Sequence, residues 1–381
     1  MSLKYYIIAG EASGDLHGSN LIKELKHIST DTIIRCWGGD KMQTAGGELV
    51  KHYRDLAFMG FSEVLKNLPT IFRNLSFCKN DITAFNPDAI ILIDYPGFNL
   101  RIAEWAKAQG YKIIYYISPQ VWAWKENRVK LIKRCVDKML VILPFEKDFY
   151  KKWQFNVEYV GHPLVQVIQE FNASIHNEVV TIQSLGGGKK IIGILPGSRK
   201  QELKIKLPIM LQVAEKFPSY QFIVGKAPGI EDDFYNPFLE KYQNVSSVRN
   251  ATYELLQQCT AAMVTSGTAT LETALFKVPQ VVCYKGNSLS YEIAKRIIKI
   301  KYISLVNLIM DKLVITELIQ NDLTVANLIK EVTLLLDENG KRNQVLQDYD
   351  QLENLLVKGG DASKNAAISI SQFMLANDAK V

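Results

Sequence analysis

An arginine that follows an apolar run and a glycine turn could bind a phosphate group. Residues 191–195 read as a buried parallel strand, and Pro196-Gly197-Ser198-Arg199 comes next. A helical pattern follows over residues 201–217, and Pro208 is predicted to divide it. Free N–H groups at a helix start and a planar guanidinium both bind anions. A plain strand–turn–helix with a surface arginine explains the pattern equally well.

A second helix start of this kind occurs later in the chain. A strand predicted for residues 261–264 leads into Thr265-Ser266-Gly267-Thr268. If the two strands are neighbours, this start lies within reach of Arg199. Glu272, one turn into the helix, could accept hydrogen bonds from a ribose diol. It could equally be a carboxylate that favours the positive end of the helix dipole.

Acidic residues in the first half could accept a proton. Asp94 follows a predicted strand at residues 89–93, where open α/β sheets place ligand-binding groups. The competing interpretation is a cap for the helix predicted at residues 99–108. The stretch Gly10-Glu11-Ala12-Ser13-Gly14-Asp15 precedes a helix predicted for residues 16–28 and lacks GxGxxG spacing. Its glycines permit close approach of a ligand, but the bare pattern favours helix capping.

Two apolar stretches have both a functional and a structural interpretation. Gln120 and Trp122 lie just after a predicted strand and could contact a sugar or an acyl chain, or the tryptophan could belong to the core. Residues 58–79 mix large apolar side chains with lysine and arginine, as membrane-interface segments do. An amphipathic helix packed on a sheet is the interpretation that this pattern alone favours.

A repeated alternation of strands and helices must position these residues. It runs to about residue 170, gives way to a polar, glycine-rich stretch, and restarts at Ile191. The alternation predicts two α/β domains with doubly wound parallel sheets. A length of 381 residues and 48% hydrophobic content agree with two globular domains.

The composition argues against several classes of function. Five cysteines without a CxxC pair and five scattered histidines give no metal-site pattern and favour reduced thiols. Because there is no signal-peptide layout and no run of 18 apolar residues, we expect a cytoplasmic protein without a membrane span. A net charge of +6 does not demand nucleic acid. Without GxGxxG, an NAD-dependent oxidoreductase is disfavoured.

Several short motifs occur in one order along nearly the whole chain. They are Gly10–Asp15, Met59–Phe61, Ile93–Asn99, Tyr116–Trp124, Leu143–Glu146, Gly161–Pro163, Leu195–Arg199, Ser266–Glu272 and Tyr302–Asn307. Each motif is weak alone, but the ordered set resembles the lipid-A-disaccharide synthase family, the inverting glycosyltransferases of the lipid A pathway.

The resemblance implies a GT-B architecture, in which two Rossmann-like domains face each other across a cleft. We expect an N-terminal domain over residues 1–170, joined by helices at about 345–381, and a UDP-sugar-binding domain over residues 171–344. The implied substrates are UDP-2,3-diacylglucosamine and 2,3-diacylglucosamine 1-phosphate (lipid X). The implied setting is the inner face of the cytoplasmic membrane, with peripheral attachment, no cofactor, no metal and no nucleic acid. A homodimer is compatible with the resemblance.

The resemblance also implies residue roles. Asp94 is the expected catalytic base, with Glu11 and His17 as open alternatives, and Arg199 is expected to stabilise the departing diphosphate. The nucleotide-binding set is Gly197, Ser198, Arg199, Ser266, Gly267, Thr268, Glu272 and Asn307. The substrate-binding set is Glu11, Ser13, Gly14, Asp15, Gln120 and Trp122. The membrane-contact set is Val64, Leu65, Leu68, Ile71 and Phe72, for which membrane contact is now favoured because both substrates are lipids.

Some features limit these expectations. Gly97 stands where some family members have a second acidic residue, so a base shared by two carboxylates is not expected. A UDP-N-acetylglucosamine 2-epimerase or a peptidoglycan-type N-acetylglucosaminyltransferase would share the fold and nucleotide, but the stretches 11–15 and 118–124 argue against both. A non-catalytic UDP-sugar or lipid-binding protein is the alternative from another class, and the presence of Asp94 and Arg199 argues against it.

Overall fold

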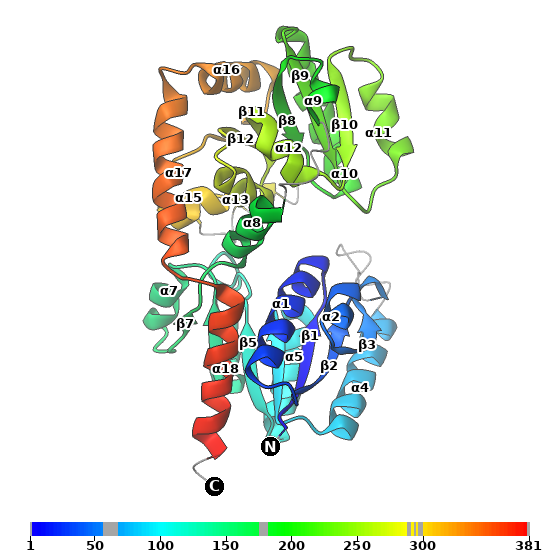
Figure 1. The fold of residues 1–381 in the computed structure, drawn as a ribbon, viewed down its shortest axis with the longest axis vertical. Coiled ribbons are helices and arrows are strands. Elements are labelled where there is room, and N and C mark those ends of the chain that lie inside the picture. Colours follow the sequence, from blue (N-terminus) through cyan, green and yellow to red (C-terminus); the bar gives the residue numbers. More distant parts are fainter. Residues whose placement is uncertain are drawn as a thin grey trace. The chain divides into compact units, whose positions relative to one another are not determined.

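Two compact units make up the protein. The computed structural model describes residues 2–55, 68–174, 182–287, 291–292, 295 and 300–378. Unit 1 consists of Met1–Pro163 with Leu356–Val381, and unit 2 consists of Leu164–Leu355. Each unit is built on its own sheet, and every strand pair is parallel (Figure 1).

The sheet of unit 1 has seven strands in the order β3-β2-β1-β4-β5-β6-β7. They are β1 (Lys4–Ala9), β2 (Ile33–Gly38), β3 (Glu48–His52), β4 (Ala89–Ile93), β5 (Lys112–Tyr116), β6 (Lys138–Val141) and β7 (Glu158–Tyr159). The strand order reverses direction between β1 and β4, where Ala9 pairs with Ile93. The segments that follow these two residues therefore emerge side by side at the carboxyl edge, the usual ligand position in such sheets.

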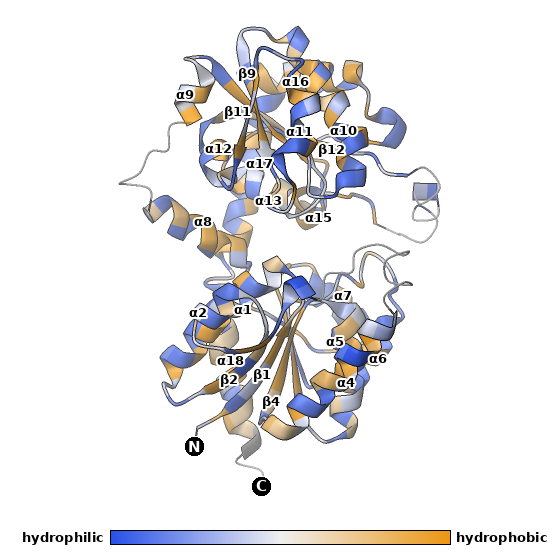
Figure 2. Cartoon of the chain, turned by 90° about the vertical axis from the view of Figure 1, so that its right-hand side faces the viewer, coloured by the Kyte–Doolittle hydropathy of each residue, from blue (hydrophilic) through white to orange (hydrophobic). Residues whose placement is uncertain are grey.

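Helices cover both faces of this sheet. One face carries α1 (Ala12–Ile28), α2 (Asp40–Thr44) and α18 (Ala362–Asp378), and the other carries α4 (Leu68–Phe85), α5 (Pro96–Ala108), α6 (Arg128–Cys135) and α7 (Glu146–Lys152). Because side chains alternate along a strand, Tyr5 and Ile7 enter one core while Tyr6 and Ile8 enter the other. The strands are accordingly apolar throughout (Figure 2).

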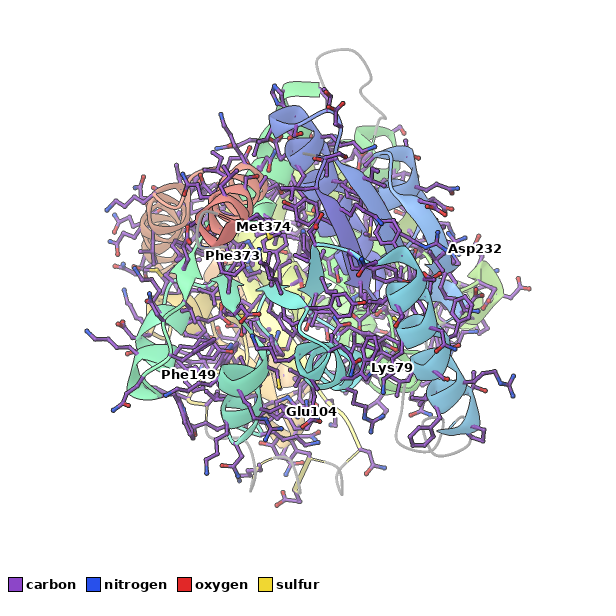
Figure 3. All side chains as sticks on the ribbon, turned by 90° about the horizontal axis from the view of Figure 1, so that it is seen from below. Lys79, Glu104, Phe149, Asp232, Phe373 and Met374 are labelled. Atoms are coloured by element: carbon purple, nitrogen blue, oxygen red, sulfur yellow. The ribbon has the colours of Figure 1, made fainter. Side chains whose placement is uncertain are left out.

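The last helix, α18, completes unit 1 after the chain has passed through unit 2. Its residues Ala366, Ala367, Ile370 and Met374 are buried in the core that contains α1. Phe373 and Met374 are neighbours on this helix (Figure 3). Unit 1 therefore depends on side chains from both ends of the sequence.

The sheet of unit 2 has six strands in the order β10-β9-β8-β11-β12-β13. They are β8 (Lys190–Leu195), β9 (Tyr220–Lys226), β10 (Val245–Arg249), β11 (Cys259–Thr265), β12 (Gln280–Tyr284) and β13 (Glu317–Ile319). The helical segments are α8 (Pro163–Ser174), α9 (Ile182–Gly186), α10 (Lys200–Gln212), η3 (Val213–Lys216), α11 (Asp232–Leu239), α12 (Thr252–Gln258), α13 (Thr268–Leu275), α15 (Leu305–Met310), η4 (Gln320–Asp322), α16 (Val325–Leu336) and α17 (Lys341–Val357). The reversal falls between β8 and β11, where Leu195 pairs with Val264.

The predicted pair of doubly wound parallel sheets is confirmed, whereas some helix boundaries differ. Helix α1 begins at Ala12 rather than Leu16, so Ser13 and Asp15 lie inside its first turn. Helix α10 continues through Pro208, and the predicted division there is wrong. A proline removes one backbone hydrogen bond, and the buried neighbours Leu207 and Met210 keep the helix packed. In the described part of the chain, no helix has the length and apolarity to cross a membrane.

Candidate functional site

A pocket of about 510 Å³ lies at the carboxyl edge of the unit 2 sheet. The turn after β8, the end of β9 and the start of α13 form most of its wall. It is lined by Leu195, Gly197, Ser198, Arg199, Glu202, Gly225, Lys226, Ala227, Pro228, Thr252, Thr265, Ser266, Gly267, Thr268, Ala269, Glu272 and Tyr284. The predicted proximity of the two helix starts follows from the direct pairing of β8 with β11.

Arg199 reaches this pocket from a turn that requires glycine. Gly197 has φ +95°, and a Cβ added there would lie 3.0 Å from Cγ2 of Thr265. The Arg199 side chain is 71% exposed, and its Nη1 donates to Oε1 of Glu202 at 3.1 Å. Sequence reasoning missed Glu202, although its position three residues along the same helix was the available signal.

The start of α13 supplies backbone donors. Gly267 is its N-cap residue, and no side chain caps this end. The first N–H groups of a helix have no partner within the helix, so here they remain available to an anion. The neighbouring Ser266 hydroxyl donates to the carbonyl oxygen of Ile303 at 2.8 Å, which fixes the turn that leads into the helix.

Glu272 lies one turn further along α13 and is half-buried. The hydroxyl of Tyr253 donates to Oε1 of Glu272 at 3.0 Å. Burial raises the pKa of Glu272, and the hydrogen bond from Tyr253 opposes this rise. The Tyr253 ring packs against Phe171 and Phe276, with ring centroids 5.2 Å apart in each pair. Tyr253 thus orients the carboxylate, a contact that sequence reasoning did not identify.

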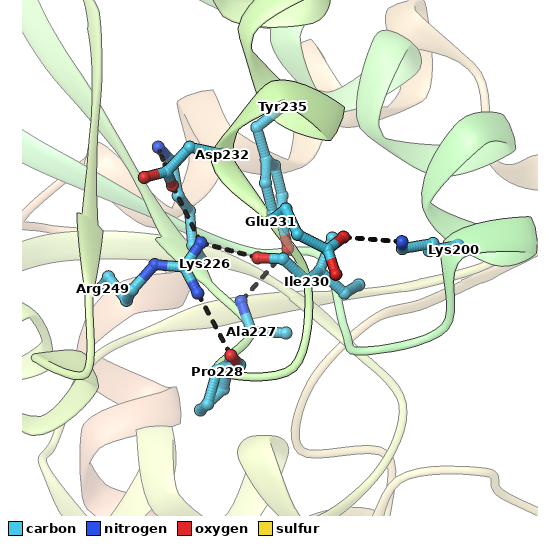
Figure 4. Close-up of polar contacts among 9 residues, drawn as sticks. All are labelled: Lys200, Lys226, Ala227, Pro228, Ile230, Glu231, Asp232, Tyr235 and Arg249. Atoms are coloured by element: carbon cyan, nitrogen blue, oxygen red, sulfur yellow. Dashed lines mark hydrogen bonds and ion pairs between the residues drawn. The ribbon is translucent and has the colours of Figure 1, made fainter.

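The loop after β9 forms a braced rim of the pocket (Figure 4). Asp232 accepts from Lys226 and Arg249, both at 2.9 Å. Arg249 also donates to the carbonyl oxygens of Pro228 and Ile230, at 3.1 and 2.6 Å. These contacts hold the pocket-lining backbone of residues 226–228 in one arrangement.

The carboxyl edge of unit 1 carries acidic groups instead. Asp94 is half-buried directly after β4. Burial raises the pKa of Asp94 to about 7, with a further contribution from the negative charge of Glu11. A carboxylate with this pKa can accept a proton near neutral pH.

The backbone around Asp94 is strained and firmly held. Asp94 and Tyr95 have φ values of 42° and 47°, which side-chain-bearing residues adopt rarely. Asn99 Nδ2 and the Tyr115 hydroxyl donate to the Asp94 carbonyl oxygen at 2.8 and 2.6 Å. Asn99 is fully buried and also donates to the Ile93 carbonyl oxygen at 3.2 Å. Strain of this kind is concentrated at functional sites.

The predicted substrate-binding residues near α1 divide into two groups. Glu11 and Ser13 are exposed at the start of the helix. Asp15 is 3% exposed, and its carboxylate accepts from the backbone N–H groups of Gly39, Lys41 and Met42 at 2.7–3.2 Å. Asp15 therefore fixes the start of α2, whereas Glu11 and Ser13 remain open to a ligand.

Two further residues near α1 are held by packing. Gly14 packs against Ala9, where an added Cβ would meet another Cβ at 3.0 Å. His17 is the open alternative to Asp94 as the base, and burial lowers its pKa to about 4. His17 is therefore neutral at physiological pH.

Gln120 and Trp122 follow β5. Gln120 is exposed, and the half-buried Trp122 ring packs edge-on against Phe145 with centroids 5.0 Å apart. Glu146 lies next to this pair and is 1% exposed. Burial raises the pKa of Glu146 to about 8, so the group is protonated at neutral pH, while the N–H of Leu143 donates to its Oε2 at 3.0 Å.

Asn307 is not brought to the pocket. It is fully buried, and its side-chain amide bonds to Val314, Ile315 and Glu317 at 2.9–3.0 Å. Glu317 in turn accepts from the N–H groups of Ile303 and Ser304. Asn307 thus stabilises the segment that receives the Ser266 hydrogen bond, one step away from the lining.

Part of the membrane-contact set lies outside the described residues. This applies to Val64 and Leu65 and to the side chain of Leu68. On α4, Ile71 is half-buried and packs against the unit 1 core, whereas Phe72 is 60% exposed and Phe77 is 48% exposed. Over the residues that the model describes, no group of three or more His, Cys, Asp or Glu side chains could hold a metal ion.

Comparison with known proteins yields one family over nearly the full length. The family model of lipid-A-disaccharide synthetase matches residues 5–370. Lipid-A-disaccharide synthase of Geobacter metallireducens is 37% identical over 372 residues, with 96% of each chain covered. The enzyme of the same name from Nitrosococcus oceani is 39% identical over 359 residues, covering 93% of this chain and 92% of that one.

Solved structures resemble the fold at low sequence identity. The UDP-GlcNAc 2-epimerase of Neisseria meningitidis superposes with a TM-score of 0.67 at 13% identity, covering 98% of this chain and all of that one. The glycotransferase of kitacinnamycin also gives 0.67, at 14% identity, with 97% and 99% covered. The two sheets thus form the GT-B type of fold shared by these glycosyltransferases and epimerases.

Proposed function

The chain belongs to the lipid-A-disaccharide synthase family, a group of UDP-sugar glycosyltransferases of lipid A biosynthesis, and from this premise we propose its reaction. It transfers 2,3-diacylglucosamine from UDP-2,3-diacylglucosamine to the 6-hydroxyl of lipid X. The products are a β-1,6 disaccharide 1-phosphate and UDP, with inversion at the anomeric carbon. The fold alone would also allow an epimerase, and the family match over residues 5–370 favours the transferase.

The donor nucleotide is assigned to the pocket of unit 2. The observation that carries this assignment is that the exposed Arg199 guanidinium and the uncapped start of α13 line the same pocket. Both groups favour a diphosphate. The Neisseria epimerase of similar fold was solved with UDP-GlcNAc bound. Glu272, oriented by Tyr253, would accept hydrogen bonds from the ribose hydroxyls.

The proton is assigned to Asp94. The 6-hydroxyl oxygen forms the new bond to the anomeric carbon as the bond from that carbon to UDP breaks. The hydroxyl proton passes to the Asp94 carboxylate, and UDP leaves with the bonding electrons, stabilised by Arg199 and the α13 N–H groups. Glu11 and Ser13 would contact the acceptor sugar, as would Gln120 and Trp122. None of these steps uses a metal ion or a cofactor.

The lipid substrates place the reaction at a membrane surface. We assign peripheral contact with the inner face of the cytoplasmic membrane to the segment that ends in α4, where Phe72 and Phe77 are exposed. Single exposed aromatics and a few basic residues would give weak, reversible attachment. A homodimer remains part of this proposal, and nucleic acid does not.

The test is a direct reconstitution. Purified protein, UDP-2,3-diacylglucosamine and lipid X are mixed in detergent with EDTA, and products are followed by mass spectrometry. Formation of the disaccharide 1-phosphate together with UDP supports the proposal and its metal independence. Measurable UDP binding without this product would reject the acceptor assignment and favour another acceptor or a binding protein.

A further inference from the structure

One lysine side chain is completely buried beneath the unit 2 pocket. Lys206 lies in the middle of α10 and is 0% exposed. Its ammonium donates to Oε2 of Glu202, 3.2 Å away, and to the hydroxyl of Thr265. A buried ammonium is costly unless it is paired and hydrogen-bonded, so these two contacts are central to how Lys206 is accommodated.

Both partners of Lys206 line the pocket. Glu202 uses its other oxygen, Oε1, to accept from Arg199 at 3.1 Å. Thr265 ends β11, directly before the turn into α13, and its methyl group packs under Gly197. Lys206 therefore connects the turn that carries Arg199 with the turn that carries the helix start.

The charges of this group explain why the lysine matters. Glu202 holds Arg199 in place, but its negative charge would cancel that of the guanidinium and repel a diphosphate. Adding the buried ammonium leaves a net charge of +1 over Arg199, Glu202 and Lys206. Because Lys206 lies out of water, its field is screened less than that of a surface lysine.

We propose that Lys206 is a positioning residue that compensates the charge of Glu202, so that Glu202 can orient Arg199 without weakening its attraction for the diphosphate of UDP. The inference rests on the proposed nucleotide site. It adds a residue that does not touch the substrate and acts through Glu202 and Arg199. Burial lowers the pKa of Lys206, and the Glu202 carboxylate opposes this change, as expected for an ammonium held by one carboxylate.

The experiment measures UDP binding by calorimetry in four proteins: the unmodified chain, Lys206→Met, Glu202→Gln, and the double variant. Methionine keeps the length of the side chain and removes its charge. Lys206→Met is expected to weaken UDP binding about tenfold, because an uncompensated carboxylate then faces the diphosphate. In the Glu202→Gln background, the same substitution should change affinity less than about twofold, since no charge remains to compensate.

Lys204→Met is the matched control. Lys204 is exposed on the same helix two residues earlier, so the variant has the same net charge as Lys206→Met. Its UDP affinity should equal that of the unmodified chain. Melting temperatures separate loss of folding from loss of affinity.

Two results would overturn the inference. One is an unchanged affinity in folded Lys206→Met. The other is an equal loss in both backgrounds, which would indicate a purely structural lysine. If Lys206→Met alone fails to fold, the comparison of Glu202→Gln with the double variant still decides, because a tenfold loss there contradicts the inference. If the unmodified chain binds no UDP, the proposed function itself is rejected.

Discussion

The carboxyl edges of the two sheets have the same topology and opposite electrostatics. In unit 1 the loops beyond the strands hold Glu11, Asp94 and Glu146. In unit 2 the equivalent edge holds Arg199, Lys206 and the uncapped start of α13. The position of a site is therefore set by where the strand order reverses, and its chemistry by the residues in the loops.

Burial has different consequences on the two sides. In unit 1 burial raises the pKa values of Asp94 and Glu146 to about 7 and about 8 and so makes them better proton acceptors or donors near neutral pH. In unit 2 the buried Lys206 ammonium is paired with Glu202, and the exposed guanidinium remains the group that meets the ligand. Proton transfer and leaving-group stabilisation thus call for opposite environments.

Removing the base should give the largest effect. Asp94→Asn is expected to lower kcat about 10³-fold while leaving UDP affinity within about twofold, because the amide keeps the shape and cannot accept the proton. Steady-state kinetics and calorimetry check this pair of values. Near-normal turnover would move the base assignment to Glu11.

The same substitution should stabilise the protein at alkaline pH. The pKa of Asp94 is raised in the folded state, so its contribution to stability is present below about pH 4 and is lost as the pH rises through about 7. Asp94→Asn should therefore raise the melting temperature at pH 8 and have little effect at pH 4. An equal change at both pH values would contradict the burial argument.

Removing the guanidinium should affect both binding and turnover. Arg199→Ala is expected to lower kcat/KM for the UDP-sugar about 10²-fold and to weaken UDP binding, since the charge is lost from the leaving-group side. The KM for lipid X should change little. Unaltered UDP affinity would separate Arg199 from the nucleotide and remove the contrast between the two edges.

The pH profile should follow the acidic edge. Below about pH 7, kcat/KM is expected to fall about tenfold per pH unit as Asp94 becomes protonated, and above pH 7 it should level off. Glu11→Gln should move the inflection to lower pH, because the Glu11 charge contributes to the raised pKa of Asp94. An inflection that does not move would show that burial alone sets it.

The smallest effect is expected at the ribose position. Tyr253→Phe removes the hydroxyl that donates to Glu272 and keeps the ring that packs on Phe171 and Phe276. The KM for the UDP-sugar should rise about threefold to tenfold, with kcat nearly constant. A change in kcat alone would show that Glu272 does not act through ground-state binding.

The sequence predicted the sheets and the strand ends well because both depend on local apolar runs. Asp94 and Arg199 lie where their strands end, as expected. The occupied carboxylate of Asp15 and the buried amide of Asn307 were not foreseen, because their partners are backbone groups of other segments. Lys206 reads as one more basic residue on a helix until β11 places Thr265 above it.

The return of α18 to unit 1 has a consequence for synthesis on the ribosome. Residues 1–163 are made first, yet the core around α1 lacks Ala366, Ile370 and Met374 until the last helix emerges. All of unit 2 is translated in that interval and can complete its own sheet. A nascent chain therefore carries an uncovered apolar face on α1 for more than half of its elongation, and a premature stop before Ala362 would leave that face exposed permanently.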